Sequence, residues 1–62
     1  MNIPEQIKDA REAAGLSKAE AARRAEVDWS TWSRWEAGIS EPSFEQLGKI
    51  ATLLGVTLEV KP

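Results

Sequence analysis

The sequence predicts an all-α fold, a compact bundle of four helices followed by a short C-terminal β-strand. Four segments carry apolar residues at helical spacing, and each is bounded by residues that start or stop a helix. The connectors between these segments are short, as in bundles whose helices share one core. The tail after the last segment changes period, because apolar and polar residues alternate in it as they do in a strand.

The chain has 62 residues, enough for one small domain. A domain of this size buries only about 60% of the surface that its unfolded chain exposes, so it usually needs a disulfide, a metal or a partner chain. The sequence contains no cysteine and no histidine. A disulfide is therefore excluded and a zinc site is not expected, which leaves a second chain as the stabilising partner.

The chain is slightly acidic, with a net charge of −2 and a pI of about 5.0. This balance does not favour nucleic acid by default, although the local field over one face matters more than the sum. No run of residues is apolar enough to span a membrane, and no signal-peptide pattern is present, so we expect a cytoplasmic location. Without histidine, cysteine or a phosphate-binding glycine loop, we expect no enzyme activity and no cofactor.

The first two predicted helices span residues 3–14 and 18–25. The first carries an apolar stripe and is stopped by Gly15, which can adopt a left-handed conformation. The second begins with a capping box, in which Ser17 and Glu20 satisfy each other's backbone N–H groups. The second helix is rich in alanine and can approach its neighbours closely.

The third predicted helix follows after a turn of about two residues. Asp28 is its predicted N-cap, and it ends near Ala37 before Gly38. So short a connection forces a sharp angle between the second and third helices. The two therefore form a helix-turn-helix unit.

The fourth predicted helix spans residues 44–54 and begins with a second capping box at Ser43. Its apolar stripe, which we expect in the core, consists of Phe44, Leu47, Ile50, Ala51 and Leu54. We expect residues 1–55 to form the helical domain and residues 56–62 to form the strand.

The third helix has two contrasting sides when its residues are placed at 100° intervals. Thr31, Trp32 and Trp35 share one side, and we expect both tryptophans in the core. The other side carries a ring, two hydroxyls and a guanidinium, from Trp29, Ser30, Ser33 and Arg34. A short helix with one aromatic side and one hydrogen-bonding side suits the major groove of DNA.

The run GLSKAEAARRAEVDWSTWSRWEAG, followed by EPSFEQLGKIATLLGV, resembles the Cro/repressor-type (XRE-like) helix-turn-helix family. That family includes phage repressors, restriction-system controllers and many antitoxins, and the likeness covers about residues 3–56. The resemblance implies a compact Cro/repressor-like bundle whose third helix enters the major groove.

Carried over by position, the resemblance also implies which residues act. The base-reading residues fall on Trp29, Ser30 and Arg34, with Ser33 beside them. For Trp29 the alternatives are a half-exposed ring packed on Lys18 or Arg34, and a contact with a protein partner. The phosphate contacts fall on Ser17, Lys18 and Ser43, at the N-termini of the second and fourth helices. A structural ion pair falls on Arg11 and Glu36.

The sequence departs from the family pattern at several positions. Trp29 stands where the family usually has glutamine or a basic residue. Glu26 stands where the family usually has glycine, and a left-handed residue with a side chain costs about 1–2 kcal/mol. Glu41 makes the loop before the fourth helix acidic instead of basic, and the tail is a predicted strand instead of a fifth helix.

These features predict a sequence-specific transcriptional regulator, in the role of a repressor, that binds double-stranded DNA as a homodimer. The expected dimer contact is the tail strand paired with its copy, with Val56, Leu58 and Val60 facing the helices. A frayed tail with Val56 and Leu58 docked on the fourth helix is the alternative for this segment. The alternative function is an antitoxin-like interaction module whose main partner is a protein such as a toxin.

Overall fold

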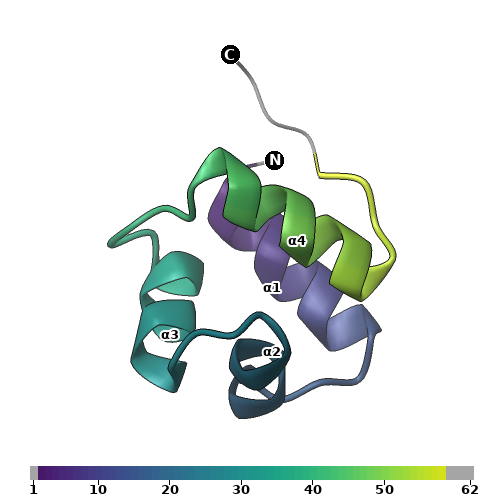
Figure 1. Cartoon of the computed structure of the whole chain (residues 1–62), viewed down its shortest axis with the longest axis horizontal. Helices are drawn as coiled ribbons and strands as arrows, with labels where there is room; N and C mark the ends of the chain where they lie inside the picture. The colour runs from purple at the N-terminus through teal and green to yellow at the C-terminus, as the bar shows by residue number, and fades with distance from the viewer. Residues whose placement is uncertain (1, 59–62) are drawn as a thin grey trace.

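The computed structural model describes residues 2–58, and four helices form this part of the chain: α1 (Ile3–Ala13), α2 (Lys18–Arg24), α3 (Trp29–Ala37) and α4 (Phe44–Leu54). In Figure 1, α4 lies in front of α1, while α3 lies at one edge of the bundle and α2 below them. The predicted bounds are confirmed to within one residue. The two differences, at Ala14 and Ala25, are the C-caps of α1 and α2.

Each helix is preceded by an N-cap residue whose side chain accepts a hydrogen bond from a backbone N–H group of the first turn. The four N-cap residues are Asn2, Ser17, Asp28 and Ser43. Both predicted capping boxes are formed, and their partners are Glu20 for Ser17 and Gln46 for Ser43. Because such caps satisfy donors that the helix itself leaves unpaired, they fix where a helix starts.

All four helices contribute side chains to one core. Trp32, Ile7 and Ile50 are the largest fully buried side chains, and Trp35 joins them. The rings of Trp32 and Trp35 lie 5.6 Å apart and tilted by 55°, a favourable arrangement for an aromatic pair. The prediction that both tryptophans belong to the core is confirmed. From α2 the cluster receives only small side chains, those of Ala21, Ala22 and Ala25.

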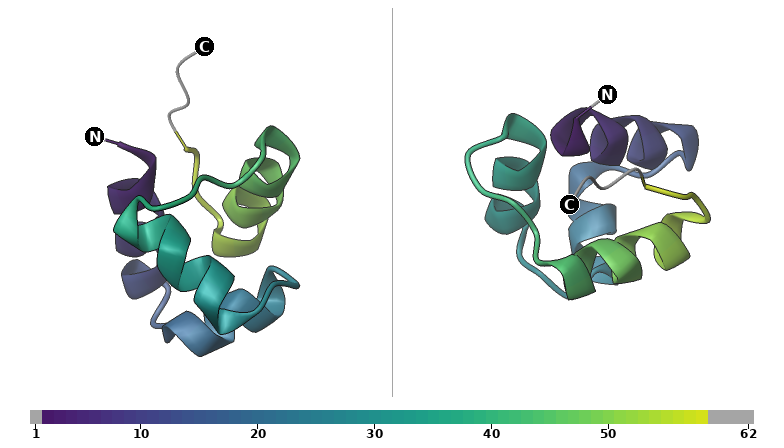
Figure 2. Two further views of the ribbon diagram at one scale, coloured as in Figure 1. Left: turned by 90° about the vertical axis from the view of Figure 1, so that its left-hand side faces the viewer. Right: turned by 90° about the horizontal axis from the view of Figure 1, so that it is seen from above.

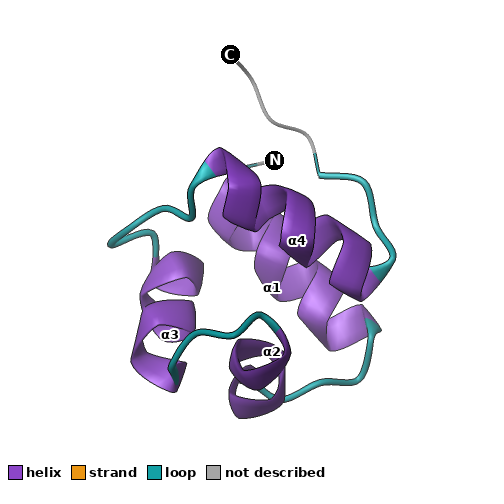
Figure 3. Ribbon diagram, in the orientation of Figure 1, coloured by secondary structure: helices purple, strands orange, loops and turns teal. Residues whose placement is uncertain are grey.

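The segment after α4 turns back and runs between α1 and α4 in both views of Figure 2. The predicted strand is not formed over residues 56–58, and Figure 3 shows this segment as loop. A strand needs a partner for its backbone N–H and C=O groups, and the described part of the chain offers only helices. Leu58 packs against the core, whereas Thr57 is exposed. Val60 lies outside the described residues.

Phe44, predicted in the core, lies on the surface with 82% of its area exposed. It is the first residue of α4, and the core side of that helix is supplied by Leu47 and Ile50, further along. The apolar stripe of α4 therefore extends beyond the part of the helix that its neighbours cover. An uncovered phenylalanine ring on a small domain marks a candidate contact surface.

The turn between α2 and α3 contains the one non-glycine residue of the described chain with a positive φ. Glu26 has a φ of 63°, as its position in place of the family's glycine predicted. Its side chain makes an exposed ion pair with Lys49, in which the Lys49 Nζ to Glu26 Oε1 distance is 3.3 Å. An exposed pair of this kind contributes little. The left-handed backbone therefore carries a conformational cost that its side chain does not offset.

Replacing Glu26 with glycine is expected to stabilise the fold by about 0.5–1 kcal/mol, because relief of the left-handed strain exceeds the entropy that glycine adds to the unfolded chain. For a domain of this size, that corresponds to a rise in Tm of about 2–8 °C. Thermal melting followed by circular dichroism measures it.

The matched control is Glu26→Gln, which keeps the strain and removes only the charge facing Lys49. This variant is expected to change Tm by less than about 2 °C. A Glu26→Gly variant that melts at or below the Tm of the wild type would show that the turn is not strained.

Candidate nucleic-acid interface

Helix α3 presents one polar side to the outside of the bundle because its other side is held in the core. Trp32 and Trp35 are buried, whereas Trp29, Ser30 and Arg34 are exposed. Ser33, on the polar side, is half-buried. The structure thus brings the four residues predicted to read bases onto one accessible side of one helix, at the edge of the bundle (Figure 1).

The start of α3 is fixed by Asp28. Its carboxylate accepts hydrogen bonds from the hydroxyl and from the backbone N–H of Thr31, the latter at 3.3 Å. These bonds, above all the one from the Thr31 hydroxyl, lower the pKa of Asp28 below its ordinary value. The charge of this cap is therefore partly satisfied inside the chain.

Trp29 stands at the first position of α3 with 55% of its surface exposed. Lys18, the first residue of α2, lies beside it, and its Nζ is 6.0 Å from the centroid of the Trp29 ring. This is the outer distance of a cation–π contact. The ring and the ammonium group form one small surface where the N-terminal ends of α2 and α3 meet.

The C-terminal half of α3 is anchored by an ion pair between α3 and α1. Arg11 Nε lies 2.6 Å from Glu36 Oε2, and Arg11 Nη2 lies 3.2 Å from Glu36 Oε1. Both side chains are largely buried, at 10% and 4% exposed. The indole N–H of Trp32 donates to the same Glu36 carboxylate. The pair therefore links α1 to the buried tryptophan side of α3.

Arg11 also connects this pair to the loop before α2. Its Nη1 donates to the backbone carbonyl of Leu16 at 2.8 Å. The hydrogen bond with Glu36 raises the pKa of Arg11 above its ordinary value, which burial opposes. A single guanidinium thus joins α1, the start of the helix-turn-helix unit and α3, which fixes how far the polar side of α3 projects.

The two serines predicted to contact phosphates both act as helix caps. The Ser17 hydroxyl oxygen accepts from the Glu20 N–H at 3.1 Å, and the Ser43 oxygen accepts from the Gln46 N–H at 3.1 Å. A hydroxyl that accepts one hydrogen bond still has its own proton to donate. Each serine can therefore cap its helix and donate to an anion at the same time.

Lys8 is a candidate that the sequence reasoning missed. With Lys18, Ser33 and the end of α3 it lines an open hollow of about 160 Å³ beside the polar side of that helix. The sequence contained a signal for this position. Residues three apart in a helix share a face, and Arg11, three residues after Lys8, contacts α3. Two lysines therefore flank the hydrogen-bonding side of α3, although the whole chain is acidic.

Other kinds of site find no support in residues 2–58. No group of three or more acidic, cysteine or histidine side chains in this range is placed to hold a metal ion. None of the four helices is long and apolar enough to cross a membrane.

The arrangement defines a class of protein, since a short turn joins α2 to α3 and the second of these helices presents its polar side outward. A family model described as a helix-turn-helix domain matches residues 5–61, which is most of the chain. The chain belongs to this helix-turn-helix family, and the resemblance noted from its residues is confirmed at that level. Searches of curated proteins and of solved structures gave no match.

Breaking the Arg11–Glu36 pair from one side is expected to be costly, because the remaining charge stays buried without its partner. Arg11→Met and Glu36→Gln should each lower the free energy of unfolding, by up to about 3–5 kcal/mol. The double variant should lose less than the sum of the two, by about 1–3 kcal/mol. Urea denaturation of the four proteins of the cycle measures this coupling.

The control is Glu12→Ala. Glu12 also lies 3.9 Å from Arg11, but its side chain is 55% exposed. Its removal should cost less than about 1 kcal/mol. Strict additivity in the Arg11–Glu36 cycle would mean that the pair does not hold α3 in place.

Proposed function

We propose that the protein is a sequence-specific DNA-binding transcriptional regulator whose α3 reads bases in the major groove. The observation that carries this proposal is the exposed polar side of α3, opposite a side that is fully used in packing. Arg34 can donate two hydrogen bonds to guanine, and the hydroxyls of Ser30 and Ser33 can pair with several base edges. The chain acts as a repressor by occupying its operator.

Phosphate contacts position the protein on the duplex. Lys18 and Lys8 both line the hollow beside Ser33 and supply positive charge that attracts the backbone. The hydroxyls of Ser17 and Ser43 donate to phosphate oxygens from the first residues before α2 and α4. This division assigns affinity to the lysines and serines, and sequence preference to α3.

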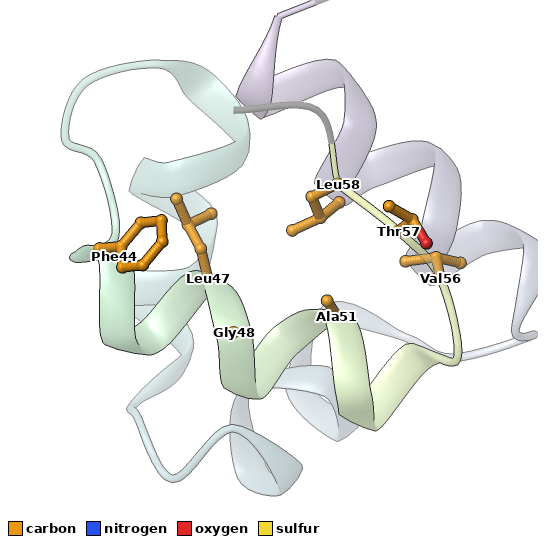
Figure 4. A pocket seen from close by; sticks show the side chains of 7 residues that line it. All are labelled: Phe44, Leu47, Gly48, Ala51, Val56, Thr57 and Leu58. Atoms are coloured by element: carbon orange, nitrogen blue, oxygen red, sulfur yellow. The ribbon is translucent and has the colours of Figure 1, made fainter. Parts of the chain in front are cut away.

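The regulator acts as a homodimer, which places two α3 helices about 34 Å apart, one turn of DNA. The supporting observation is an apolar surface made by the start of α4 and the tail. Figure 4 shows Leu47 and Leu58 pointing into the space between α4 and the tail, with Phe44 at one end. Together with Val56 they line an open hollow of about 300 Å³. Pairing of tail segments, including Val60, adds to this contact.

A protein partner, such as a toxin bound by an antitoxin, is the second candidate. Two exposed apolar residues favour it, since Ile39 and Phe44 are 75% and 82% exposed and the chain is acidic overall. The two functions are compatible in one protein, because the apolar residues lie outside the polar side of α3.

Selection of binding sites from random duplex DNA tests the leading proposal. It should return a two-fold symmetric site, and the logarithm of its affinity should fall steeply with the logarithm of salt concentration. A protein that recovers no preferred sequence and binds no duplex at low salt would instead be an interaction module.

Arg34→Ala and Lys8→Ala are expected to weaken binding to the selected site in different ways. The first should relax the preference at one base pair, at a cost of about 1–3 kcal/mol. The second should weaken binding to all duplexes alike and reduce the salt slope by about one unit. Fluorescence anisotropy against the selected duplex and a scrambled one, at several salt concentrations, measures both effects.

Lys49→Ala is the control, since Lys49 pairs with Glu26 and is assigned no contact with DNA. This variant should keep the sequence preference of the wild type and the same dependence of DNA affinity on salt concentration. A Lys8 variant that changes base preference, or an Arg34 variant that changes only the slope, would reverse the roles assigned here.

Phe44→Ser is expected to weaken the homodimer by about fivefold or more, since an anchor residue in an interface contributes over about 1 kcal/mol. Its folding should be little affected, because the ring is exposed in the single chain. Ile39→Ser is the matched control, because Ile39 is similarly exposed but does not line the hollow. Analytical ultracentrifugation compares the three proteins. A wild-type chain that stays monomeric at high micromolar concentration would refute the dimer.

A further inference from the structure

Trp29 is the residue of α3 whose place the packing does not explain. The other two tryptophans of that helix are in the core, whereas 55% of Trp29 faces outward on the side that carries Ser30, Ser33 and Arg34. A large aromatic ring among hydrogen-bonding side chains gives that surface one apolar contact point, which suits a ligand that has an apolar group beside polar ones.

The chemistry of the indole ring limits what Trp29 can recognise. Its Nε1–H is a donor only, and the rest of the ring forms no conventional hydrogen bonds. The base edges of the major groove present acceptors and donors at every base pair but only one apolar group, the C5-methyl of thymine. The ring can therefore distinguish bases chiefly through that methyl group.

The position of Trp29 suits such a contact. It is the first residue of α3, and the N-terminal residues of a recognition helix are those that meet base edges. Lys18 Nζ lies 6.0 Å from the ring centroid and brings a cation beside the ring that a phosphate can bind. The polar neighbours are then left to form the hydrogen bonds that Trp29 cannot form.

We propose that Trp29 reads the C5-methyl group of a pyrimidine in the major groove, so that its ligand is a duplex with thymine or 5-methylcytosine at one defined step. The inference rests on the proposed function, because it needs α3 in the groove. Since 5-methylcytosine carries the same methyl group at the same place on the groove edge, methylation of a cytosine at that step would strengthen binding. The protein would thereby respond to cytosine methylation at its site.

The experiment starts from the duplex selected by the wild-type protein. Each thymine of one half-site is replaced in turn by deoxyuridine, which removes the methyl group and keeps the base pair. At the methyl-sensitive step, cytosine and 5-methylcytosine are also compared. Kd is measured by fluorescence anisotropy for the wild type, Trp29→Ala and Trp29→Gln, with Ser30→Ala as a control that alters the same side of α3.

One deoxyuridine position should weaken wild-type binding by about fourfold, the effect of exposing one buried methyl group. The same replacement should change Kd by less than about 1.5-fold in both Trp29 variants, while Ser30→Ala keeps the full sensitivity. At that step the wild type should bind 5-methylcytosine about fourfold more tightly than cytosine. Circular dichroism verifies that the variants fold, as expected for an exposed residue.

The outcomes separate the two proposals. If no duplex is selected, the proposed function fails and this inference fails with it. If a site is selected but no position is sensitive to the methyl group, or if the Trp29 variants keep that sensitivity, the methyl contact is refuted and the regulator stands.

Discussion

The carboxylate of Glu36 is the group on which the arrangement of the helices depends. It is almost fully buried, and it accepts hydrogen bonds from Arg11 of α1 and Trp32 of α3, while Arg11 reaches on to the carbonyl of Leu16. A charge taken out of water is tolerated only with its partners in good geometry. Because those partners come from different parts of the chain, few orientations of α3 satisfy them all, and the exposed polar side of that helix follows from this constraint.

The helices around α3 contribute unequal side-chain volumes to the core. α2 supplies only alanines to the core, which lets it approach closely, and the space that larger residues would occupy is filled by Trp32 and Trp35. Total volume matters more to a core than the identity of each contributor. The turn that joins α2 to α3 is a separate source of strain, because Glu26 adopts a left-handed backbone there. The turn that orients α3 is thus the strained part of a well-packed helix-turn-helix unit.

The success of the sequence predictions depended on how local the determining interactions are. Helix bounds were predicted to within one residue because caps such as Ser17 and Asp28 act within a single turn. The two sides of α3 were predicted because residues at 100° intervals place Trp32 and Trp35 together, opposite Ser30 and Arg34. Periodicity identified the stripe of α4 but not which end is covered, so Phe44 was misplaced. The strand predicted for residues 56–58 is not formed because pairing needs a distant partner. Lys8 was missed because the predicted Arg11–Glu36 pair placed α1 beside α3 but did not indicate a hollow there that Lys8 lines.

The unequal surroundings of the three tryptophans give the protein two built-in optical reporters. Trp32 and Trp35 lie together in the core, so their emission follows the folded state. Trp29 is half exposed at the end of α3, so its emission follows what approaches that surface. With Trp29 replaced by phenylalanine, the difference between the two spectra isolates the signal of the surface ring. Occupancy of α3 and unfolding of the domain can then be followed separately in one unlabelled sample.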